Sequence, residues 1–426
     1  MGMLKNIGIV WLWYVGLPLA YHFAKKWYNV VGFDISQRRL SELTEWVDST
    51  HEIGATIKDV QILYTSDPIA LKTMECIIVT VPTPITENKD PDYTPLIKAS
   101  EMIGSILQPW QIVVYESTVD PGATEEICLP VLEKMSGLSC PKDFAIWYSP
   151  ERINPGDKEH TVDKIAKVVG AIDDNTLTIV SEMYGSIINA TIHKAPSIKV
   201  AEASKIIENT QRDINIWFIN ELSQICDKLW INTFDVIEAA STKWNFLKFT
   251  PGLVGGHCIG VDPYYLAKRA QKLGLNPELI LAWRRTNDGM GLYVAHHVIK
   301  MLIQANIKVQ KAKVLVLGLT FKENVPDFRN SRIGDVIKEL KEFGIDIEGY
   351  DPYSEQAHEH ILQELSLSKD EVITSLHPST YDGVIYAQDH KEFSALDIAS
   401  LLKSDGIFFD IKGKFRKAWF THYKSL

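Results

Sequence analysis

An α/β unit at the start of the chain constrains the fold more than any other feature. Residues 7–10 are an apolar run, residues 17–26 have a helical pattern, and residues 29–35 form a second strand pattern that carries Asp34 near its end. A strand, a helix and a strand in this order predict the first βαβ unit of a dinucleotide-binding fold. An acidic residue at the end of the second strand accepts hydrogen bonds from the adenosine ribose, so Asp34 favours NAD over NADP.

The turn after the first strand departs from the usual glycine pattern. A G-x-G-x-x-G fingerprint would have glycine at positions 11, 13 and 16, whereas the sequence has Trp11, Trp13 and Gly16. The first two glycines allow a tight turn and a close approach of the backbone to a pyrophosphate, and an indole would fill that space. Taken alone, the departure is also compatible with another kind of α/β unit.

Further strand patterns over residues 76–81, 111–117 and 144–148 end in polar residues. Thr83, Thr118 and Glu151 follow these strands. Ligands of open parallel sheets bind at the carboxyl ends of the strands. Each of the three residues could be an ordinary strand-end cap, but three in succession favour a shared crevice.

A long helical pattern over residues 200–229 carries a stripe of polar residues. Lys205, Asn209, Arg212 and Asn215 recur at three- and four-residue spacing and so share one face. A solvated face is the ordinary explanation for such a stripe. The opposite apolar positions, which we expect to supply packing between domains or subunits, are Ile206, Ile207, Ile214 and Phe218.

A glycine-rich loop follows this helix, with the sequence PGLVGGHCIGVDPYYL over residues 251–266. It holds Cys258 between His257 and Asp262, among four glycines that let a substrate approach the sulfur closely. Most isolated cysteines are inert buried thiols. The glycines favour a nucleophile instead, with a thiolate that neighbouring charges stabilise.

The last third of the chain repeats the α/β pattern. After a helical region at 277–306 come a strand at 313–321, a helix at 333–343, a strand at 345–350 and late strands at 383–387 and 407–411. We predict an α/β protein with two Rossmann-like, doubly wound parallel-sheet domains joined by a long central helix. The predicted domains are 1–196, which binds the dinucleotide, 197–306, which is helical and dimerises, and 307–426.

Composition excludes several classes. The content is 46% hydrophobic and 23% charged, as in globular proteins, and no apolar run approaches the roughly 18 residues of a membrane span. The first residues lack the pattern of a signal peptide, so we expect a cytoplasmic protein. Five cysteines outside CxxC spacing predict neither disulfides nor zinc. A net charge of −10 argues against nucleic acid as the main partner.

Together these motifs resemble the nucleotide-sugar 6-dehydrogenases of the UDP-glucose dehydrogenase superfamily, and most closely the bacterial branch that acts on UDP-N-acetylhexosamines. The resemblance covers nearly the whole chain. It rests on VTVPTP, YESTVDPGATEE, YSPERINPGD, ENTQRDIN, GLVGGHCIGVDPYYL and GLTFKENVPDFRNSR. It implies that the enzyme oxidises the C6 hydroxymethyl of the sugar to a carboxylate with two NAD as hydride acceptors and one water for hydrolysis, through a cysteine thiohemiacetal and thioester, for surface polysaccharide precursors.

The resemblance also implies roles for individual residues. Cys258 is the nucleophile, Lys205 and Asn209 stabilise oxyanions, Glu151 and Asp262 handle protons and water, and Thr118 binds water. Cofactor contacts fall on Val15, Gly16, Asp34, Arg39, Thr83, Thr118, Lys322 and Arg329. Substrate contacts fall on Glu151, Arg152, Lys205, Asn209, Gly255 and Lys322, and the 307–426 domain binds the UDP-sugar. No metal is implied, and we expect a homodimer or a larger homo-oligomer.

Two other functions remain open at this point. A homologue with impaired NAD binding would bind UDP-sugar without turnover, which Trp11 and Trp13 favour. A simple two-electron alcohol dehydrogenase would not need Cys258. The sequence does not distinguish GlcNAc, GalNAc and ManNAc as the sugar.

Tryptophan recurs where turn geometry or the family pattern favours glycine. These positions are Trp11, Trp13, Trp27, Trp46, Trp110, Trp147 and Trp230, whereas Trp244 has a native context. One hypothesis covers all seven. A lineage that translates UGA as glycine would yield this sequence if its UGA codons were written as tryptophan, and deliberate mutation is the alternative.

Overall fold

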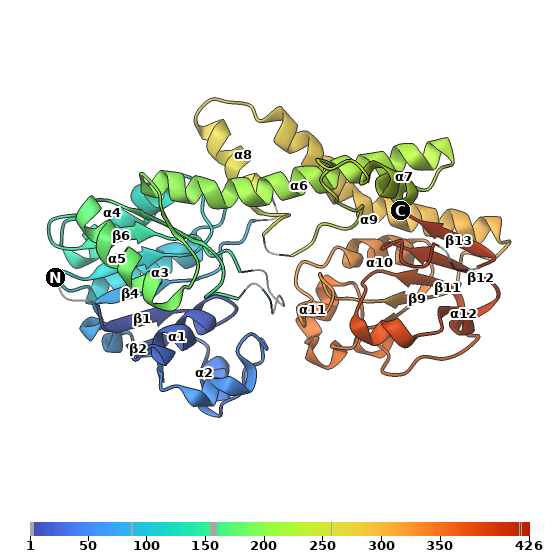
Figure 1. Ribbon diagram of the computed structural model, residues 1–426. Coiled ribbons are helices and arrows are strands. Elements are labelled where there is room, and N and C mark those ends of the chain that lie inside the picture. The colour runs from blue at the N-terminus through green and yellow to red at the C-terminus, as the bar shows by residue number, and fades with distance from the viewer. Residues whose placement is uncertain are drawn as a thin grey trace. The chain divides into compact units, whose positions relative to one another are not determined.

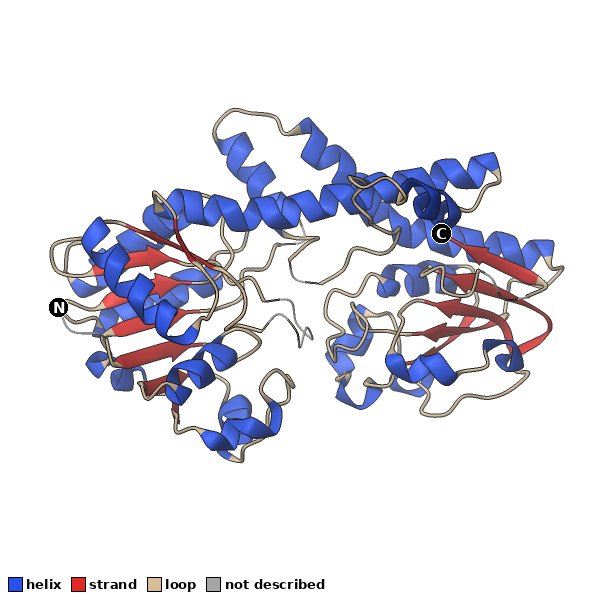
Figure 2. Ribbon diagram, viewed as in Figure 1, coloured by secondary structure: helices blue, strands red, loops and turns tan. Residues whose placement is uncertain are grey.

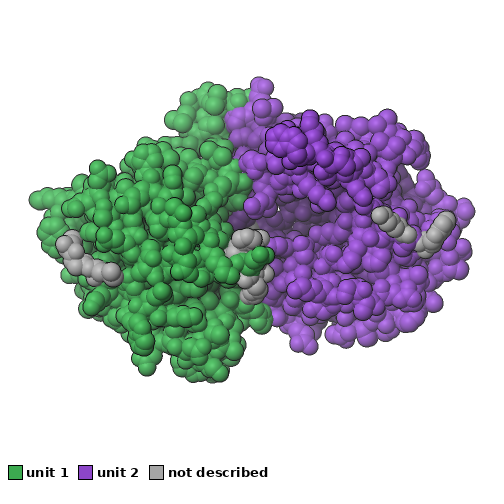
Figure 3. Space-filling model, viewed as in Figure 1, with its two compact units in different colours: residues 1–209, 264–276 green, residues 210–263, 277–426 purple. Residues whose placement is uncertain are grey.

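The computed structural model describes residues 4–86, 88–153, 159, 161–256, 258–416, 418 and 420–426. The chain divides into two compact units, shown in green and purple in Figure 3. Unit 1 comprises Met1–Asn209 and Tyr264–Asn276, and unit 2 comprises Thr210–Pro263 and Pro277–Leu426. Each unit contains one β-sheet with helices packed on it (Figure 2).

Unit 1 is built on an eight-stranded sheet with the order β3-β2-β1-β4-β5-β6-β7-β8. Neighbouring strands are parallel except β6 and β7, which are antiparallel, so the sheet is mixed at this point rather than wholly parallel as predicted. The strands are β1 Asn6–Val10, β2 Asn29–Phe33, β3 Leu63–Thr65, β4 Cys76–Val79, β5 Ile112–Tyr115, β6 Ala145–Tyr148, β7 Lys167–Ala171 and β8 Ile192–Lys194.

Alternating strand residues divide the core of unit 1 between the two faces of its sheet. Ile7 and Ile9 of β1 lie in one apolar cluster with α1, α2 and α5, while Val10 lies in the other with α3 and α4. This is the alternation expected when both faces of a sheet are covered. The helices are α1 Gly16–Lys25, α2 Gln37–Thr44, α3 Thr94–Ile106, α4 Leu129–Ser136 and α5 Asp174–Ile187.

The strand order of unit 1 creates a switch point between β1 and β4. The chain runs from β1 outward to β2 and β3, and then returns to β4 on the other side of β1. Ligands of doubly wound sheets bind beyond the carboxyl ends of the strands at such a point. The loop of residues 11–15 and the segment after β4 both begin there.

The long helix predicted in the middle of the chain is α6, Ile198–Leu229, drawn in green in Figure 1. Its residues up to Asn209 belong to unit 1 and those from Thr210 to unit 2. It is followed by α7 Thr233–Ala240, α8 Asp262–Lys272 and α9 Glu278–Gln304. Among the described residues, no helix is both long and apolar enough to cross a membrane.

Unit 2 contains a five-stranded parallel sheet with the order β10-β9-β11-β12-β13. The prediction of two doubly wound sheets joined by a long helix is therefore confirmed. The strands are β9 Lys313–Leu317, β10 Asp346–Tyr350, β11 Tyr381–Tyr386, β12 Leu402–Asp410 and β13 His422–Ser425, and the helices on them include α10 Ile333–Glu342, α11 Glu359–Glu364 and α12 Ile398–Leu401.

Candidate functional site

The turn from β1 into α1 is built around Gly16. A Cβ atom at this position would lie 1.8 Å from the carbonyl oxygen of Trp11 and 2.7 Å from Oγ1 of Thr80. The Thr80 hydroxyl is within hydrogen-bonding distance of the carbonyls of Val10 and Trp11, at 2.9 and 2.8 Å. The first turn of α1, with Val15 at its N-cap, therefore packs directly on the end of β1. This is the packing that the third glycine of the fingerprint provides.

Asp34 lies at the end of β2 beside this turn and is buried. Its Oδ2 accepts a hydrogen bond from the backbone N–H of Leu12 at 2.9 Å, and its Oδ1 accepts one from Ser36 at 2.8 Å. A carboxylate has about four acceptor positions, and the described residues occupy two of those of Asp34. The carboxylate is thus placed where the ribose of a dinucleotide is expected.

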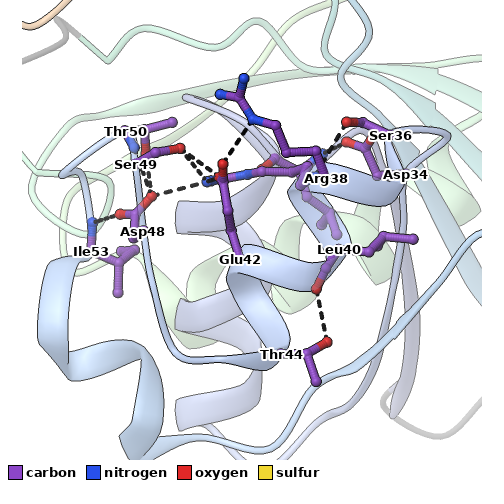
Figure 4. A network of polar contacts seen from close by, with 12 residues as sticks. Asp34, Ser36, Arg38, Leu40, Glu42, Thr44, Asp48, Ser49, Thr50 and Ile53 are labelled. Atoms are coloured by element: carbon purple, nitrogen blue, oxygen red, sulfur yellow. Dashed lines mark hydrogen bonds and ion pairs between the residues drawn. The ribbon is translucent and has the colours of Figure 1, made fainter. Parts of the chain in front are cut away.

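Arg39 of α2 is fully buried and hydrogen-bonds to the same turn. Its Nε donates to the carbonyl of Leu12 at 2.7 Å, and its Nη2 lies 3.1 Å from Oδ1 of Asp48. Figure 4 shows Asp48 with its other donors, which include Thr50 and the backbone of Ile53. Burial alone would raise the pKa of Asp48, but these hydrogen bonds and the Arg39 charge hold it below its usual value. Each described contact of Arg39, which was assigned to the cofactor, is thus with another group of the protein.

Glu151 follows β6 and lies close to the start of β7. Its Oε1 accepts hydrogen bonds from the backbone N–H groups of Arg152 and Ile153, both at 2.6 Å, and its Oε2 lies 3.3 Å from Nζ of Lys167. Burial alone would raise the pKa of Glu151, but the Lys167 charge, the Ile153 N–H and the Lys205 charge lower it. The carboxylate is therefore held in its ionised form.

Lys167 is shared with a second carboxylate, that of Glu116. Its Nζ lies 2.5 Å from Oε2 of Glu116, and the hydroxyl of Tyr184 donates to the other oxygen of Glu116. Burial raises the pKa of Glu116 to about 7, against the effect of Lys167. Lys167 thus connects Glu151 to a buried cluster that consists of Glu116, Lys167 and Tyr184.

Lys205 and Asn209 lie on α6 and are both buried. They are four residues apart and so share one face of the helix, as predicted, whereas Arg212 of the same predicted stripe is exposed. Lys205 is near enough to Glu151 to lower the pKa of that carboxyl. Arg152 reaches the same helix, with its Nη2 3.0 Å from Oε1 of Glu208.

Thr83 and Thr118 follow β4 and β5 and are half-buried. The segment that holds Thr83 is fixed by the buried Tyr265 of α8, whose hydroxyl donates to the carbonyl of Pro84 at 2.9 Å. The side chain of Ser117, next to Thr118, donates to the carbonyl of Val81 at 2.6 Å. The bond of Ser117 joins the segments that follow the neighbouring strands β4 and β5, and the shared crevice of Thr83, Thr118 and Glu151 stays a prediction.

In unit 2 the cysteine loop leads into α8. Cys258 is exposed, and its carbonyl accepts hydrogen bonds from the backbone N–H groups of Val261 and Asp262 at 3.0 and 2.8 Å. Asp262, the first residue of α8, is buried. A Cβ atom on Gly255 would lie 2.7 Å from the carbonyl oxygen of Asn330, so the loop packs on this segment. His257, singled out with the loop, lies outside the described residues.

The segment after β9 holds the two basic residues assigned to ligand contacts. Arg329 is half-buried and forms a bidentate pair with Asp327, with Nε–Oδ1 and Nη2–Oδ2 distances of 2.9 and 2.7 Å. The carbonyl of Lys322 accepts a hydrogen bond from the hydroxyl of Thr320 at 3.0 Å. Asn330 of the same segment donates through its side chain to the carbonyl of Gly256 at 2.6 Å, next to Gly255 of the cysteine loop.

Sequence reasoning missed the cluster of Glu116, Lys167 and Tyr184. Glu116 directly follows the apolar strand β5, and Lys167 begins the buried strand β7. The sequence feature that could have indicated this cluster is a pair of opposite charges beside buried strands, because a buried charge is normally paired. The pairing itself depends on the strand order, which places β6 between β5 and β7.

Three family models match the chain in sequence order. The NAD binding domain of the UDP-glucose/GDP-mannose dehydrogenase family matches residues 5–188, the central domain matches 199–289, and the UDP binding domain matches 315–417. The chain belongs to this family. It is an NAD-dependent sugar-nucleotide dehydrogenase, as the resemblance implied.

Individual relatives agree with this family. Protein CapL from Staphylococcus aureus is 51% identical over 414 residues, and the alignment covers 96% of each chain. The UDP-N-acetyl-D-glucosamine 6-dehydrogenase of Pseudomonas aeruginosa is 51% identical over 412 residues, again with 96% of each chain covered. Among solved structures, UDP-D-ManNAc dehydrogenase from Pyrococcus horikoshii superposes with a TM-score of 0.88 at 28% identity and covers 98% of each chain.

The dehydrogenase's own residues fit the family's cofactor only in part. Gly16 and Asp34 fit NAD, because they allow α1 to pack on β1 and place a carboxylate at the ribose position. Trp11 and Trp13 do not fit. Their rings lie 6.3 Å apart on the loop that a pyrophosphate must approach closely. The misfit with NAD is therefore confined to these two indoles, while Gly16 and Asp34 fit the cofactor.

Proposed function

We propose that this dehydrogenase oxidises the C6 hydroxymethyl of a UDP-N-acetylhexosamine to the uronic acid. Relatives that are 51% and 47% identical are named UDP-N-acetyl-D-glucosamine 6-dehydrogenases, whereas those named UDP-N-acetyl-D-mannosamine dehydrogenases are 30–33% identical. The higher identity favours N-acetylglucosamine as the sugar. By its family resemblance, the acid serves as a precursor of surface polysaccharide.

The observation that carries this proposal is the exposed thiol of Cys258 just before the N-terminus of α8. A helix N-terminus favours the thiolate. Attack of the thiolate on a C6 aldehyde would form a thiohemiacetal, loss of hydride from it would leave a thioester, and water would release the acid. The hydride acceptor of the family is NAD.

Lys205 and Asn209 supply positive charge and a hydrogen-bond donor for oxygen at C6. Both are buried, and a buried donor stabilises a developing oxyanion more strongly than one in water. We assign them to the oxyanions that form when the alcohol is deprotonated and when the thiolate attacks the aldehyde.

Glu151 and Asp262 are the carboxylates assigned to protons and water, with Thr118 as a water ligand. Lys167 supports this role for Glu151, because its charge helps to lower the pKa of the carboxyl. An ionised carboxylate is the form that accepts a proton from water during thioester hydrolysis. Arg152 and Gly255 remain proposed substrate contacts, and Lys322 and Arg329 remain proposed ligand contacts.

We further propose a homo-oligomer assembled through α6. Five exposed apolar residues of this helix form the α6 stripe: Val200, Ile207, Phe218, Ile225 and Leu229. At 3.6 residues per turn, spacings of 7, 11, 7 and 4 bring them onto one line. Such a stripe on a helix surface indicates an interaction with another apolar surface.

Product analysis tests the proposed function. The chain as written and its Trp11→Gly/Trp13→Gly variant are each incubated with NAD and UDP-GlcNAc, UDP-GalNAc or UDP-ManNAc, and the products are identified by mass spectrometry. We expect the variant to form the uronic acid from UDP-GlcNAc. Binding of UDP-sugar without any product by both proteins would exclude the proposed function, and an aldehyde as the end product would exclude the thioester route.

A further inference from the structure

Five tryptophans have a left-handed backbone conformation that large L-residues rarely adopt. Their φ angles are 81° for Trp11, 66° for Trp27, 63° for Trp46, 70° for Trp110 and 60° for Trp230. The other non-glycine residues with positive φ are His51, Lys89, Asn306, Lys311, Asn324, Asn330, Ser366 and Ser379. Among the described residues of 4–416, no phenylalanine or tyrosine is in this group. The conformation is thus linked to tryptophan and not to aromatic size.

Three of these tryptophans end helices in the same way. Trp27 follows α1, and its N–H donates to the carbonyl of Ala24 while the N–H of Tyr28 donates to that of Phe23. This pair of bonds defines a Schellman motif with Trp27 at the left-handed position, which is usually glycine. Trp46 after α2 and Trp230 after α6 have the equivalent pairs of bonds.

Four other helix ends in the described residues have the same motif, with glycine, asparagine or serine at the left-handed position: Gly274, Gly344, Asn306 and Ser366. Gly274 after α8 has a φ of 80°, and Gly344 after α10 has a φ of 74°. Their backbone bonds match those of Trp27: Gly274 donates to Gln271 and Leu275 to Ala270, and Gly344 and Ile345 donate to Lys341 and Leu340. Outside the three tryptophans, this position therefore holds only small residues among the described helix ends, namely glycine, asparagine and serine.

Trp110 lies at a left-handed position of a β-turn rather than at a helix end. The N–H of Gln111 donates to the carbonyl of Gln108, with Pro109 and Trp110 between them. Proline at the second position and positive φ at the third define a type II turn, which requires glycine or asparagine at the third position. Local geometry thus indicates glycine at 110 independently of the helix ends.

Trp11 is matched by a glycine in the second sheet. Trp11 follows β1, donates to the carbonyl of Phe33 at 2.8 Å, and precedes Leu12, whose N–H binds Asp34. Gly318 follows β9, donates to the carbonyl of Tyr350 at 2.9 Å, and precedes Leu319, whose N–H binds Asp351. The φ angles are 81° and 93°. The two α/β halves thus make one turn, with tryptophan in the first and glycine in the second.

Other tryptophans differ from these. Trp283 is buried, and its indole N–H donates to Oδ2 of Asp213 at 2.8 Å. Trp244 is as exposed as Trp27 and Trp230, at 92%, but its backbone is not left-handed. Trp147 lies fully buried in β6, yet its indole N–H has no hydrogen-bond partner among the residues that the structure describes. A genuine core tryptophan normally has one.

We propose that the natural protein has glycine at positions 11, 27, 46, 110 and 230, because its gene is translated with UGA as glycine while this sequence writes UGA as tryptophan. We also assign glycine in the natural protein to position 13, the second position of the fingerprint, and to position 147. UGG codons specify Trp244 and Trp283. Glycine at 11 and 13 removes both indoles from the loop before α1 and resolves the misfit with NAD.

The gene and the natural protein decide the origin of the tryptophans. We expect UGA codons at the seven positions and UGG at 244 and 283, and peptide mass spectrometry of the protein from the organism that encodes it should show glycine at 27, 46 and 230. UGG at these positions, or tryptophan in the natural peptides, overturns the proposal. Neither readout depends on the substrate, so failure here is distinct from failure of the proposed function.

Matched variants test the backbone argument. Starting from the chain as written, Trp27→Gly and Trp230→Gly should each raise the midpoint of thermal unfolding by roughly 2–4 °C. Trp244→Gly is the control, because it removes an equally exposed indole from an ordinary backbone, and it should lower the midpoint or leave it unchanged. Equal effects of all three variants would contradict the assignment of the strain to the left-handed positions.

The cofactor loop gives a second readout. Calorimetry should show that Trp11→Gly/Trp13→Gly binds NAD about tenfold or more tightly than the chain as written, because the pyrophosphate can then approach the backbone of the loop. NAD binding of equal strength by both proteins would refute the proposed cause of the misfit.

Discussion

The Nζ atom of Lys167 lies 3.3 Å from Oε2 of Glu151 while it contacts Glu116 at 2.5 Å. One buried ammonium thus serves two carboxylates, and only Glu151 of the two is a proposed catalytic group. Removing one partner of a buried ion pair leaves an uncompensated charge. Lys167 is therefore placed to influence the charge state of Glu151.

Lys167→Met should shift the pH profile of the enzyme. Lys167 lowers the pKa of Glu151, so its loss raises that pKa, and activity that needs the ionised carboxylate is lost at a higher pH on acidification. The acidic limb of kcat/KM against pH should move upward by about one unit. Lys167→Arg keeps the charge and should restore the limb, whereas Lys164→Met removes an exposed charge and serves as the control. An unmoved limb would assign Lys167 a purely structural role.

Cys258→Ser should abolish formation of the acid but leave UDP-sugar binding largely intact. A hydroxyl is a much poorer nucleophile than a thiolate at neutral pH, and the alcohol cannot sustain the thioester step. Mass spectrometry of the product and calorimetry of UDP-sugar binding measure the two effects. Cys140→Ser, a half-buried thiol in unit 1, is the control. Near-normal acid production by Cys258→Ser would remove Cys258 from the nucleophile role.

Lys205→Ala should lower kcat by about 10²–10³-fold with a much smaller effect on KM. The charge acts mainly once an oxyanion develops, and loss of one such donor has effects of this size. Lys199→Ala is the control, because Lys199 also lies on α6 but is exposed and paired with Glu126 at 3.2 Å. A change confined to KM would assign Lys205 to substrate binding instead.

Phe218→Glu should dissociate the proposed oligomer. The side chain is 56% exposed on the α6 stripe, and a buried unpaired charge would destabilise an apolar interface by several kcal/mol. Light scattering at micromolar concentration measures the mass. Lys228→Glu places the same charge on α6 outside the stripe and should leave the mass unchanged. A monomer before any substitution would refute the assembly.

Local chemistry made much of this structure predictable. The βαβ pattern gives both sheets, because strands and helices differ in the period of their apolar residues. The start of α1 at Gly16 and the end of α6 at Leu229 fall within one residue of the expected positions. The turn positions of Trp27, Trp46, Trp110 and Trp230 were predictable as well, since helix ends and tight turns depend on neighbouring residues.

Features that depend on distant residues were not predictable. Glu116, Lys167 and Tyr184 meet only because the sheet order brings β5 and β7 to either side of β6. Spacing on α6 gave the shared face of Lys205 and Asn209 correctly, but burial along a helix changes with what packs on it. Of the apolar positions expected to supply packing, Ile206 is fully buried, while Ile207 and Phe218 are exposed.

Gly318→Ala tests whether the turn shared by the two sheets depends on glycine. An added Cβ atom would lie 2.5 Å from Cβ of Gln388, on a backbone with a φ of 93°. The left-handed conformation and the overpacking together should lower the free energy of unfolding by roughly 2–4 kcal/mol. Trp11→Gly reverses the same conformational strain at the matching position and should raise it by about 0.5–1 kcal/mol.

Gly185→Ala is the matched control for this pair. Gly185 lies inside α5 with no atom within 4 Å of an added Cβ, so alanine there should stabilise the protein by about 0.5–1 kcal/mol. Calorimetric unfolding of the three variants separates the effects. Stabilisation by Gly185→Ala together with no loss from Gly318→Ala would mean that the turn after each first strand tolerates a side chain. The matching positions of Trp11 and Gly318 would then not affect the free energy of unfolding through a need for glycine.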